Sequence, residues 1–358
     1  MRLLLAGGGT GGHLFPAVAL AEQLRSEEPS GEVLFVGTER GLEYRLLPEL
    51  GWPLRTIPMS GWAGLGFIAR LKALGGLVKS LGQSRRIINE FRPDVVVGVG
   101  GYASVPVLLA ARLGGVPYLI HEQNAWPGLA NRLLGRWAKR ICLSFSEAGK
   151  AFRQAPLVVT GNPVRAAMEN CPELPAGSPV LLVFGGSHGA RAINRALVAA
   201  LPQLERWRGT LHIVHQTGAN EVDTVRKGYQ AADWPEVEVL PFITDMASAY
   251  ARSALVVCRA GATTLAELTA CGRPAVLIPY PFAANNHQTT NAKALASKGA
   301  AIMIEERDLK AAELGILIDG LLTDRPRLAS MSATARSLGQ RGAAGRLLAE
   351  CRAVARAA

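Results

Sequence analysis

The amino-acid sequence predicts an α/β protein made of two tandem, Rossmann-like, doubly wound domains. Short apolar runs that suit buried parallel strands alternate along the chain with stretches of helical spacing. A strand, a glycine-rich loop and a helix open the chain at residues 2–25, and the same order of elements returns at residues 179–201. The 358 residues, 49% of them hydrophobic, are enough for two domains of ordinary size, each with its own core.

The first half begins with a predicted strand over residues 2–6, a glycine loop over 7–12 and a helix over 14–25. Pro16 falls in the first turn of that helix, where proline is tolerated. Further strands are predicted at residues 33–36, 95–99 and 118–120. Strands that alternate with helices in this way indicate a parallel sheet covered on both faces.

The second half repeats the pattern, with a strand over residues 179–184, a glycine loop over 185–189 and a helix over 190–201. Later strands are predicted at residues 211–215, 255–258 and 275–278. The repeat is the reason for predicting a second doubly wound domain rather than an extension of the first.

A turn-rich segment at Gly161–Arg165 lies between the two halves. We therefore expect an N-terminal domain over residues 1–162 and a C-terminal domain over residues 163–340. The last stretch, about residues 341–358, is rich in alanine and arginine and has helical spacing. It either closes the second domain or packs back on the first.

The formal charge of +11 is unevenly distributed. Residues 1–165 hold 19 Lys/Arg and 11 Asp/Glu, a net charge of +8, which leaves +3 for the remainder. A basic first half indicates an anionic partner, whether nucleic acid, a phospholipid surface or a phosphorylated substrate, and the alternative is a solvated basic surface. Nucleic acid is disfavoured, because the basic segment lacks interleaved aromatic residues and no DNA- or RNA-binding motif is present.

The five cysteines form no C-x-x-C pair and no cluster with zinc-ligand spacing. A scattered, odd set is typical of reduced thiols in a cytosolic protein. The apolar run at residues 3–6 is too short for a signal-peptide core, and no run reaches the roughly 18 apolar residues that a membrane-spanning helix needs. We therefore expect a protein that is cytoplasmic or lies on a membrane from that side.

The two glycine loops predict a ligand site. Glycines let a ligand approach the backbone closely, and the N-terminus of the following helix offers unpaired N–H groups and a partial positive charge. An anionic or polyoxygenated ligand fits there, and the alternative is a tight turn without a ligand. In open α/β sheets, ligands bind at the carboxyl ends of the strands, so we expect the loops to face each other across a cleft between the domains.

A third ligand-binding segment is predicted at residues 259–267, directly after a strand. Thr263 and Thr264 stand at a helix start, where hydroxyl groups and amides can hold a diphosphate, and the carboxylate of Glu267 can accept two hydrogen bonds from a ribose diol. The alternative is ordinary helix capping with a favourable dipole. Because the chain contains no Asp-x-Asp motif, we expect helix ends and hydroxyls to stabilise a leaving diphosphate, without a metal or other cofactor.

A possible membrane-binding helix is predicted over residues 67–81. Its apolar stripe consists of Phe67, Leu71, Leu74, Val78 and Leu81. Seven basic residues and a single acidic one, Glu90, fall between Arg55 and Arg92, which suits an anionic bilayer surface. The alternative is a stripe that packs on its own sheet, and the Gly75–Gly76 pair is a point where the helix would break.

Five motifs in order resemble the MurG-type N-acetylglucosaminyltransferases of peptidoglycan synthesis, over nearly the whole chain. They lie at Gly7–His13, His121–Asn124, Gly161–Arg165, Gly185–Arg191 and Asn286–Gln288. The resemblance implies a GT-B fold, with the acceptor on the N-terminal domain and the nucleotide sugar on the C-terminal domain. It also implies an inverting transfer of GlcNAc from UDP-GlcNAc to the 4-hydroxyl of the muramoyl pentapeptide on undecaprenyl diphosphate, which converts lipid I to lipid II.

The resemblance further implies a peripheral protein on the cytoplasmic face of the bacterial plasma membrane, and a set of substrate contacts. Those beside the sugar and the acceptor are Thr10, Gly11, Gly12 and Asn124. Those on the uracil are Arg165 and Ile243, and Gln288 reads the GlcNAc ring. Those on the diphosphate and ribose are Ser187, Ala262, Thr263, Thr264, Leu265, Ala266 and Glu267. His188 and Asn285 depart from the family pattern, and no contact is assigned to them.

His13 is the candidate catalytic base. An inverting transfer needs a group that takes the proton of the acceptor hydroxyl, and an imidazole titrates near neutral pH. His13 adjoins the first glycine loop. The alternative is a histidine that only hydrogen-bonds the backbone. Glu122 is a rival or a helper, and His121 is predicted to be a structural neighbour.

Other functions remain open at this point. A UDP-GlcNAc epimerase would consume UDP-GlcNAc without an acceptor, and a transferase with a soluble acceptor would need no membrane. A NAD-dependent oxidoreductase would need only one such domain, with an acidic residue such as Glu39 after the second strand. A non-catalytic membrane scaffold would bind the nucleotide and never release UDP.

Overall fold

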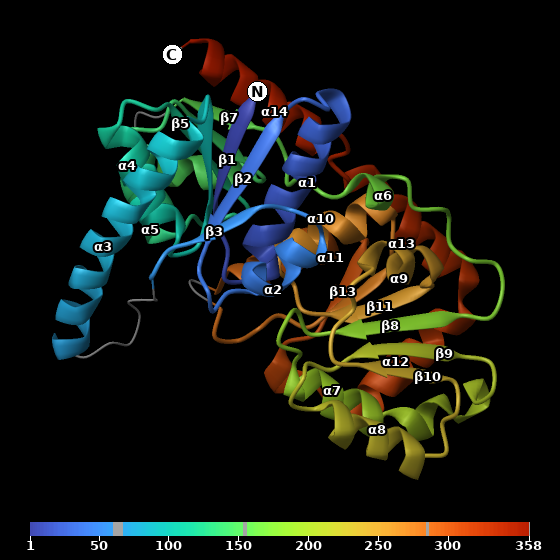
Figure 1. Ribbon diagram of the computed structural model, residues 1–358. Helices are drawn as coiled ribbons and strands as arrows, with labels where there is room; N and C mark the ends of the chain where they lie inside the picture. The colour runs from blue at the N-terminus through green and yellow to red at the C-terminus, as the bar shows by residue number, and fades with distance from the viewer. Residues whose placement is uncertain (60–66, 153–155, 284–285, 358) are drawn as a thin grey trace. The chain divides into compact units, whose positions relative to one another are not determined.

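The computed structural model describes residues 1–59, 67–152, 156–283 and 286–357, and of residues 67–75 it gives the backbone alone. The chain divides into two compact units (Figure 1). Unit 1 contains Met1–Arg165 and Gly342–Ala358, and unit 2 contains Ala166–Arg341. The predicted cleft concerns the placement of one unit against the other and stays a prediction.

Unit 1 is built on a seven-stranded sheet in the order β3-β2-β1-β4-β5-β6-β7, and every pair of neighbours is parallel. The strands are β1 (Arg2–Gly7), β2 (Glu32–Gly37), β3 (Leu54–Thr56), β4 (Val95–Gly100), β5 (Tyr118–Glu122), β6 (Arg140–Leu143) and β7 (Leu157–Val159). The sequence predicted β1, β2, β4 and β5. It missed β3, β6 and β7, which are short strands toward the two sides of the sheet and therefore have weaker apolar patterns.

Helices cover both faces of this sheet (Figure 1). They are α1 (Gly11–Glu27), α2 (Leu42–Glu49), α3 (Phe67–Phe91), α4 (Ser104–Leu113), α5 (Leu129–Gly135), the short 3-10 helix η1 (Ser146–Ala151) and α14 (Ala343–Arg356). The central strands are buried on both sides, as Leu4, Val96 and Ile120 show with no exposed surface. Continuous apolar runs, rather than alternating ones, follow from this double burial.

Helix α3 runs through Gly75–Gly76 without a break, so the predicted interruption is wrong. Two glycines cost helix stability, but packing along α4 compensates. Of the predicted apolar stripe, the side chains of Phe67, Leu71 and Leu74 lie outside the described residues. Val78 is exposed, whereas Leu81 packs against the core of unit 1.

Unit 2 has a six-stranded parallel sheet in the order β10-β9-β8-β11-β12-β13. The strands are β8 (Val180–Phe184), β9 (His212–Gln216), β10 (Val237–Leu240), β11 (Leu255–Cys258), β12 (Ala275–Leu277) and β13 (Ala301–Met303). The helices are α6 (Ala166–Glu169), α7 (Arg191–Ala199), α8 (Val222–Ala231), α9 (Met246–Arg252), α10 (Ala262–Cys271), α11 (His287–Ala296), α12 (Ala311–Thr323) and α13 (Arg325–Leu338), with 3-10 helices η2 (Leu201–Trp207) and η4 (Glu306–Asp308). Two doubly wound parallel sheets confirm the predicted fold class.

The C-terminal helix α14 packs on unit 1, against α1 and beside β4, β5 and β6. Leu347, Leu348 and Cys351 on its inner face have no exposed surface. The helix also contributes the ion pair between Arg140 and Glu350, with 3.1 Å between nitrogen and oxygen. The last residues of the chain therefore complete the core that the first residues begin.

Replacing Leu347 with alanine should lower the free energy of unfolding of unit 1 by about 2–5 kcal/mol, because a buried leucine leaves a cavity. Ile316→Ala on α12 is the control, since that side chain is 64% exposed and its loss should cost less than about 0.5 kcal/mol. Urea unfolding followed by circular dichroism measures both. Equal unfolding midpoints for the two variants would contradict the packing of α14 in this core.

Candidate functional site

Parallel pairing brings the candidate residues of each unit to one edge of its sheet. In unit 1, β1, β4 and β5 are neighbours, so the loops that follow them lie side by side at the carboxyl ends. These loops carry the glycine motif, Gly100–Gly101 and the segment after Glu122. In unit 2, β8 and β11 are neighbours, and they carry the second glycine loop and the start of α10.

The first glycine loop has backbone angles that favour glycine. Gly7, Gly8 and Gly9 have φ values of 151°, 145° and 88°. The buried carboxylate of Glu43 accepts hydrogen bonds from Gly9 N at 2.7 Å and from Thr38 N at 2.9 Å. A side chain at Gly8 would overlap this carboxylate. Glu43 thus fixes the loop from beneath while Gly9, Thr10 and Gly12 remain exposed at its rim.

His13 lies in the first turn of α1, against the loop that ends β4. Its Nδ1 is 3.2 Å from the carbonyl oxygen of Gly8. A carbonyl only accepts, so Nδ1 carries the hydrogen and donates it, which puts the lone pair on Nε2. A Cβ atom at Gly100 would lie 3.0 Å from Nε2, so glycine at that position gives the ring its space.

His121 has the structural role that the sequence predicted. It has no exposed surface, its Nε2 donates to Gly161 O at 3.1 Å, and its Nδ1 accepts from Gln123 Nε2 at 3.1 Å. Burial lowers the pKa of His121 to about 4, the hydrogen bond to Gly161 opposes that shift, and the charge of His13 adds to it. His121 is therefore neutral near pH 7 and joins β5 to the end of unit 1.

Glu122 holds together the loop that contains Asn124. Its carboxylate is 1% exposed and accepts hydrogen bonds from Asn124 N at 2.9 Å, Gly128 N at 3.3 Å and Asn131 Nδ2 at 2.8 Å. Asn124 also donates its side-chain amide to Glu122, at 3.3 Å. A buried carboxylate with this many donors is a poor candidate for a base, so the geometry favours His13 over Glu122.

Arg165 is the last residue of unit 1, and its guanidinium lies 5.5 Å from the ring centroid of Phe15 on α1. Glu22, further along α1, has a raised pKa because of burial, and the charges of Arg165 and Arg25 oppose that shift. The Nε of Arg165 is buried and has no hydrogen-bond partner among the described residues. The structure thus places Arg165 beside α1.

The second glycine loop lies between β8 and α7 and packs tightly against the turn at Thr217–Gly218, which follows β9. Gly189 and Gly218 have φ values of 74° and 81°, and a Cβ atom on either would overlap the backbone of the other loop. Gln216 donates its side-chain amide to Gly186 O at 2.8 Å. Ser187 is partly exposed, and its hydroxyl lies 3.2 Å from His188 Nδ1.

The start of α10 provides the predicted N–H groups. The helix begins at Ala262, and the first amide that is paired within it belongs to Leu265, which donates to Gly261 O at 3.0 Å. The amides before Leu265 point to the carboxyl end of the sheet as the first turn of a helix requires. The side chain of Leu265 is 2% exposed and its amide is used, so nothing in its placement favours a ligand contact.

Glu267 lies one turn into α10 and accepts a hydrogen bond from the hydroxyl of Tyr250 on α9, at 3.0 Å. Burial and the charge of Glu267 raise the pKa of Tyr250, so Tyr250 stays a donor. Thr264 and Ala266 are partly exposed on the same helix. The tyrosine fixes the direction of the carboxylate.

Gln288 and Ile243 lie in other segments of unit 2. The side-chain oxygen of Gln288 accepts from Ala260 N at 3.2 Å and Tyr280 N at 2.9 Å, which joins the loop before α10 to the segment after β12. Ile243 follows β10 and is 7% exposed, so little of its side chain is available to a base. Asn285 lies outside the described residues.

Sequence reasoning missed Glu43 and Tyr250, and it gave Arg259 no role of its own within the predicted segment 259–267. Arg259 is buried, donates to Ile278 O and Pro279 O, and pairs with Glu306. Glu39, the acidic residue that a NAD enzyme would use, is exposed. The Gly100–Gly101 pair at the end of β4 is a sequence signal that could have identified a third loop at this edge, because these glycines follow an apolar run.

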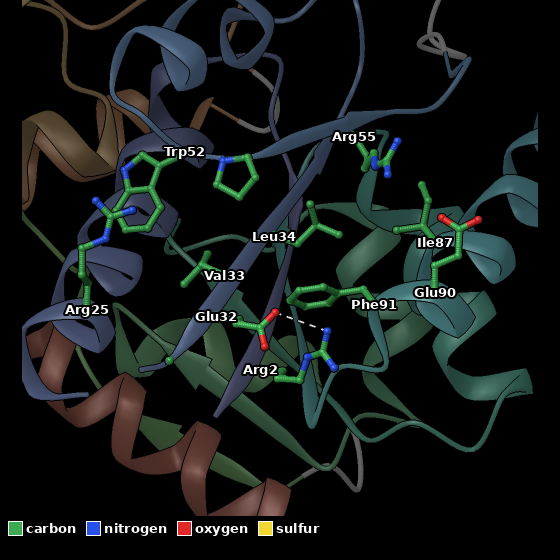
Figure 2. Close-up of a pocket in the computed structure, with 12 residues that line it drawn as sticks. Arg2, Arg25, Glu32, Val33, Leu34, Trp52, Arg55, Ile87, Glu90 and Phe91 are labelled. Atoms are coloured by element: carbon green, nitrogen blue, oxygen red, sulfur yellow. Dashed lines mark ion pairs between the residues drawn. The ribbon is translucent and has the colours of Figure 1, made fainter. Parts of the chain in front are cut away.

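Among the described residues, no three His, Cys, Asp or Glu side chains gather into a possible metal site. A cavity of about 520 Å³ lies at the amino ends of β1 and β2, the opposite end of the sheet from the glycine loop. Figure 2 shows Arg2, Arg25 and Arg55 around it, with the Arg2–Glu32 ion pair on its wall. It contains none of the predicted site residues.

The fold and the two loop edges define the class of the protein, a two-unit GT-B glycosyltransferase. The family model for the N-terminal domain of glycosyltransferase family 28 matches residues 3–143, and the model for its C-terminal domain matches residues 180–347. A crystal structure of MurG from Acinetobacter baumannii has a TM-score of 0.74 and 35% identity, covering 98% of this chain and 99% of that one.

The curated relatives are closer. The UDP-N-acetylglucosamine–N-acetylmuramyl-(pentapeptide) pyrophosphoryl-undecaprenol N-acetylglucosamine transferase of Syntrophotalea carbinolica is 59% identical over 99% of each chain. The enzyme with the same name from Geobacter sp. strain M21 is 49% identical over 98% of this chain and 95% of its own. The chain belongs to this family, the MurG N-acetylglucosaminyltransferases.

Family membership confirms the resemblance, the GT-B fold and the enzyme class that the motifs predicted. It also confirms the predicted reaction, GlcNAc transfer in the lipid I to lipid II step of peptidoglycan synthesis, and removes the epimerase, oxidoreductase and scaffold alternatives. The roles of individual residues stay predictions. In the part of the chain that the structure describes, no helix combines the length and the apolar character needed to cross a membrane.

Gly8→Ala should destabilise unit 1 by about 1–3 kcal/mol, because the new methyl group would overlap the Glu43 carboxylate at a positive φ. Gly51→Ala is the matched control, with a φ of 73° and open space around its Cβ position, and should cost about 1 kcal/mol. Chemical denaturation of both variants measures the difference. A Gly8→Ala variant as stable as Gly51→Ala would show that Glu43 does not constrain the loop.

Proposed function

We propose that this chain transfers GlcNAc from UDP-GlcNAc to the 4-hydroxyl of the muramoyl residue of lipid I, with inversion at the anomeric carbon. The proposal assigns the nucleotide sugar to unit 2 and the acceptor to unit 1. The observation that carries it is the contact of His13 Nδ1 with Gly8 O, which in the neutral ring assigns the hydrogen to Nδ1 and the lone pair to Nε2. The rival carboxylate of Glu122 is buried and already accepts hydrogen bonds from Asn124, Gly128 and Asn131.

Unit 2 would hold UDP at the start of α10. The amides of Ala262, Thr263 and Thr264 and the hydroxyl of Thr264 suit a diphosphate, because the helix dipole and the N–H groups favour negative charge there. Ser187 would reach the diphosphate from the second glycine loop. Tyr250 directs the carboxylate of Glu267, which would accept hydrogen bonds from the ribose diol.

Gln288 would read the sugar with its amide group, since its oxygen is held by Ala260 and Tyr280 and this orients the nitrogen. Ile243 would contact the uracil by its backbone or the small exposed part of its side chain. Arg165 would contact the uracil if its guanidinium leaves Phe15, a change that gives up a cation–π interaction of about 0.5–1 kcal/mol.

In unit 1, Thr10, Gly11, Gly12 and Asn124 would border the acceptor. The oxygen of the acceptor hydroxyl attacks the anomeric carbon while His13 Nε2 takes its proton, and the bond to the UDP oxygen breaks. The charge that develops on the leaving diphosphate is stabilised by the amides at the start of α10. The proposal assigns no metal ion to this step, because the chain contains no Asp-x-Asp motif.

We also propose that unit 1 lies against the anionic, cytoplasmic face of the plasma membrane, where the polyprenyl acceptor is. Val78, Lys79, Arg85 and Arg86 are exposed on α3, which suits an apolar contact with basic margins. The proposal includes no binding to nucleic acid. Co-sedimentation with vesicles that is indifferent to anionic lipid would overturn the membrane assignment.

One assay tests the whole function. Protein is mixed with UDP-GlcNAc, with and without a lipid I analogue, and both UDP and the disaccharide product are measured. UDP release and disaccharide formation should both require the analogue and occur in equal amounts. UDP release without an acceptor product would overturn the proposed transfer.

His13→Ala should lower kcat by about 10²–10⁴-fold and leave the KM for UDP-GlcNAc within a few-fold, because the base acts in the transition state. His212→Ala is the control, since that histidine pairs with Glu238 at the surface of unit 2. Steady-state kinetics with folded protein measures both. Near-normal turnover of His13→Ala would assign the base elsewhere.

Glu267→Gln should raise the KM for UDP-GlcNAc about 10- to 100-fold with a smaller change in kcat, because a charged acceptor on the ribose is lost. Tyr250→Phe should have a weaker effect in the same direction, since Tyr250 only directs the carboxylate. Direct titration of UDP gives the same comparison without chemistry. A pure loss of kcat for Glu267→Gln would contradict a binding role.

A further inference from the structure

The sheet of unit 1 has an open stretch of edge on β2, although β2 lies inside the strand order. Strand β3 is short and pairs with β2 only from Phe35 to Gly37, so residues 31–34 have no neighbouring strand on that side. On its other side, β2 pairs with β1 from Glu32 to Val36. The first half of β2 is therefore a sheet edge.

A proline ends the pairing of β3 with β2. Glu32 N donates to Met1 O on the β1 side. Phe35 N donates to Pro53 O on the β3 side. Because successive residues of a strand direct their N–H and C=O groups to opposite sides, those of Val33 face the β3 side, like those of Phe35. The residue in register to donate to Val33 O is Pro53, which has no N–H, and no hydrogen bond of Val33 to that side is present among the described residues.

The cavity of about 520 Å³ lies along this open edge (Figure 2). It is lined by Gly31, Glu32, Val33 and Leu34 of the β2 segment and by Pro53, directly before β3. Four extended residues span about 13 Å, since a parallel strand rises about 3.3 Å per residue. The cavity therefore lies where a longer β3, or a strand from another chain, would pair with Val33.

The cavity has an aromatic side chain on each face of the sheet. Leu34 belongs to the core cluster against which Ile87 and Phe91 of α3 pack, which places these side chains on one face. Trp52 lies on the opposite face, because its ring is 5.9 Å from that of Phe35, the next residue along β2. A strand added at this edge would direct successive side chains alternately toward Phe91 and toward Trp52.

Arginines lie beside both aromatic rings. The guanidinium of Arg25 is 3.5 Å from the ring centroid of Trp52. That of Arg2 is 4.9 Å from the ring centroid of Phe91. Arg55 on β3 is exposed and lies on the Phe91 face, because its partner on β2 belongs to the same core cluster. Both faces of the open edge thus carry positive charge.

The carboxylates that line the cavity are already paired, whereas two of its arginines are not. Glu32 and Glu90 form ion pairs with neighbouring arginines, at 3.3 Å and 2.7 Å between nitrogen and oxygen. Within the part of the chain that the structure describes, Arg25 and Arg55 form no ion pair. The Nε of Arg2 is buried without a hydrogen-bond partner there. The charge left over at this edge is complementary to acidic side chains.

We propose that this edge of unit 1 binds an extended acidic segment of a partner protein by strand addition. The segment lies in line with β3 and hydrogen-bonds both main-chain groups of Val33. Two consecutive acidic residues fit, because adjacent side chains of a strand point to opposite faces, one toward Arg25 and the other toward Arg55. The site is at the opposite end of the sheet from the first glycine loop, so it is separate from the proposed catalytic edge.

The first experiment measures the fluorescence anisotropy of a labelled, end-capped hexapeptide, Thr-Val-Glu-Asp-Val-Thr, with the full chain and no substrate. The peptide should bind saturably. Replacing its Glu-Asp pair with Gln-Asn should weaken binding about 4- to 25-fold, as the loss of two exposed ion pairs predicts. Replacing both valines with proline keeps the charges and should also weaken binding, because proline cannot donate to a strand edge.

No saturable binding of the Glu-Asp peptide, or equal binding of the Gln-Asn peptide, would overturn the proposal. A proline peptide that binds as well as its parent would overturn strand addition. None of these measurements uses UDP-GlcNAc or an acceptor, so their outcome is independent of the proposed transfer.

Variants of the protein locate the binding charge. Arg25→Gln and Arg55→Gln should each weaken binding of the Glu-Asp peptide about 2- to 5-fold, because each removes one ion pair. Arg195→Gln is the matched control, an exposed arginine on α7 of unit 2 that forms no ion pair among the described residues, and it should leave binding unchanged. All three side chains are exposed, so the variants should stay folded, which circular dichroism checks. Wild-type affinity in both Arg25→Gln and Arg55→Gln would place the peptide elsewhere.

The second experiment follows main-chain amide hydrogen exchange, resolved by residue with NMR, in the free and the peptide-saturated full chain. The peptide should slow exchange of the Val33 amide about tenfold or more, because this amide gains a hydrogen bond. The amide of Leu34 faces β1 and should not change. Saturable binding without protection of Val33 would contradict strand addition at this edge.

Discussion

The close packing of the loops at the carboxyl ends of β1 and β4 is the constraint on which the first glycine-loop edge depends. Gly8 and Gly101 approach so closely that a Cβ atom at Gly101 would lie 2.6 Å from Gly8 O. The buried carboxylate of Glu43 binds the loop at Gly9 N and fills the space beneath Gly8. Because the Glu43 carboxylate holds the loop, Gly8 O has a fixed position. This carbonyl oxygen accepts the hydrogen of His13 Nδ1 and so sets the tautomer of the neutral ring.

The two histidines near this edge, His121 and His13, differ in how far they are buried. His121 has no exposed surface and forms hydrogen bonds through both ring nitrogens. Its neutral side chain therefore links β5 to Gly161. His13 is partly exposed in the first turn of α1. The same residue type therefore takes a structural role at one position and a candidate chemical role at the other, and the difference is access to solvent rather than sequence context.

Much of the fold followed from the sequence, because strands buried on both faces leave continuous apolar runs such as Val95–Val99. The short strands β3 and β7 did not, since three residues carry too little pattern. Motif order located the candidate site residues. The groups that fix them, Glu43 and Tyr250, could not be predicted, because their contacts join segments of the fold without any sequence period.

Helix α10 shows how one element can serve two chemical environments. The amides of its first turn point toward the carboxyl end of the sheet and favour an anion, as the helix dipole requires. Its last residue, Cys271, lies among guanidiniums that cluster at the carbonyl end, where cations are favoured. Arg336 donates there to the main-chain carbonyl oxygens of Cys171, Pro172 and Cys271. The polarity of a single helix thus accounts both for a first turn that favours an anion and for a guanidinium on its last carbonyl oxygen.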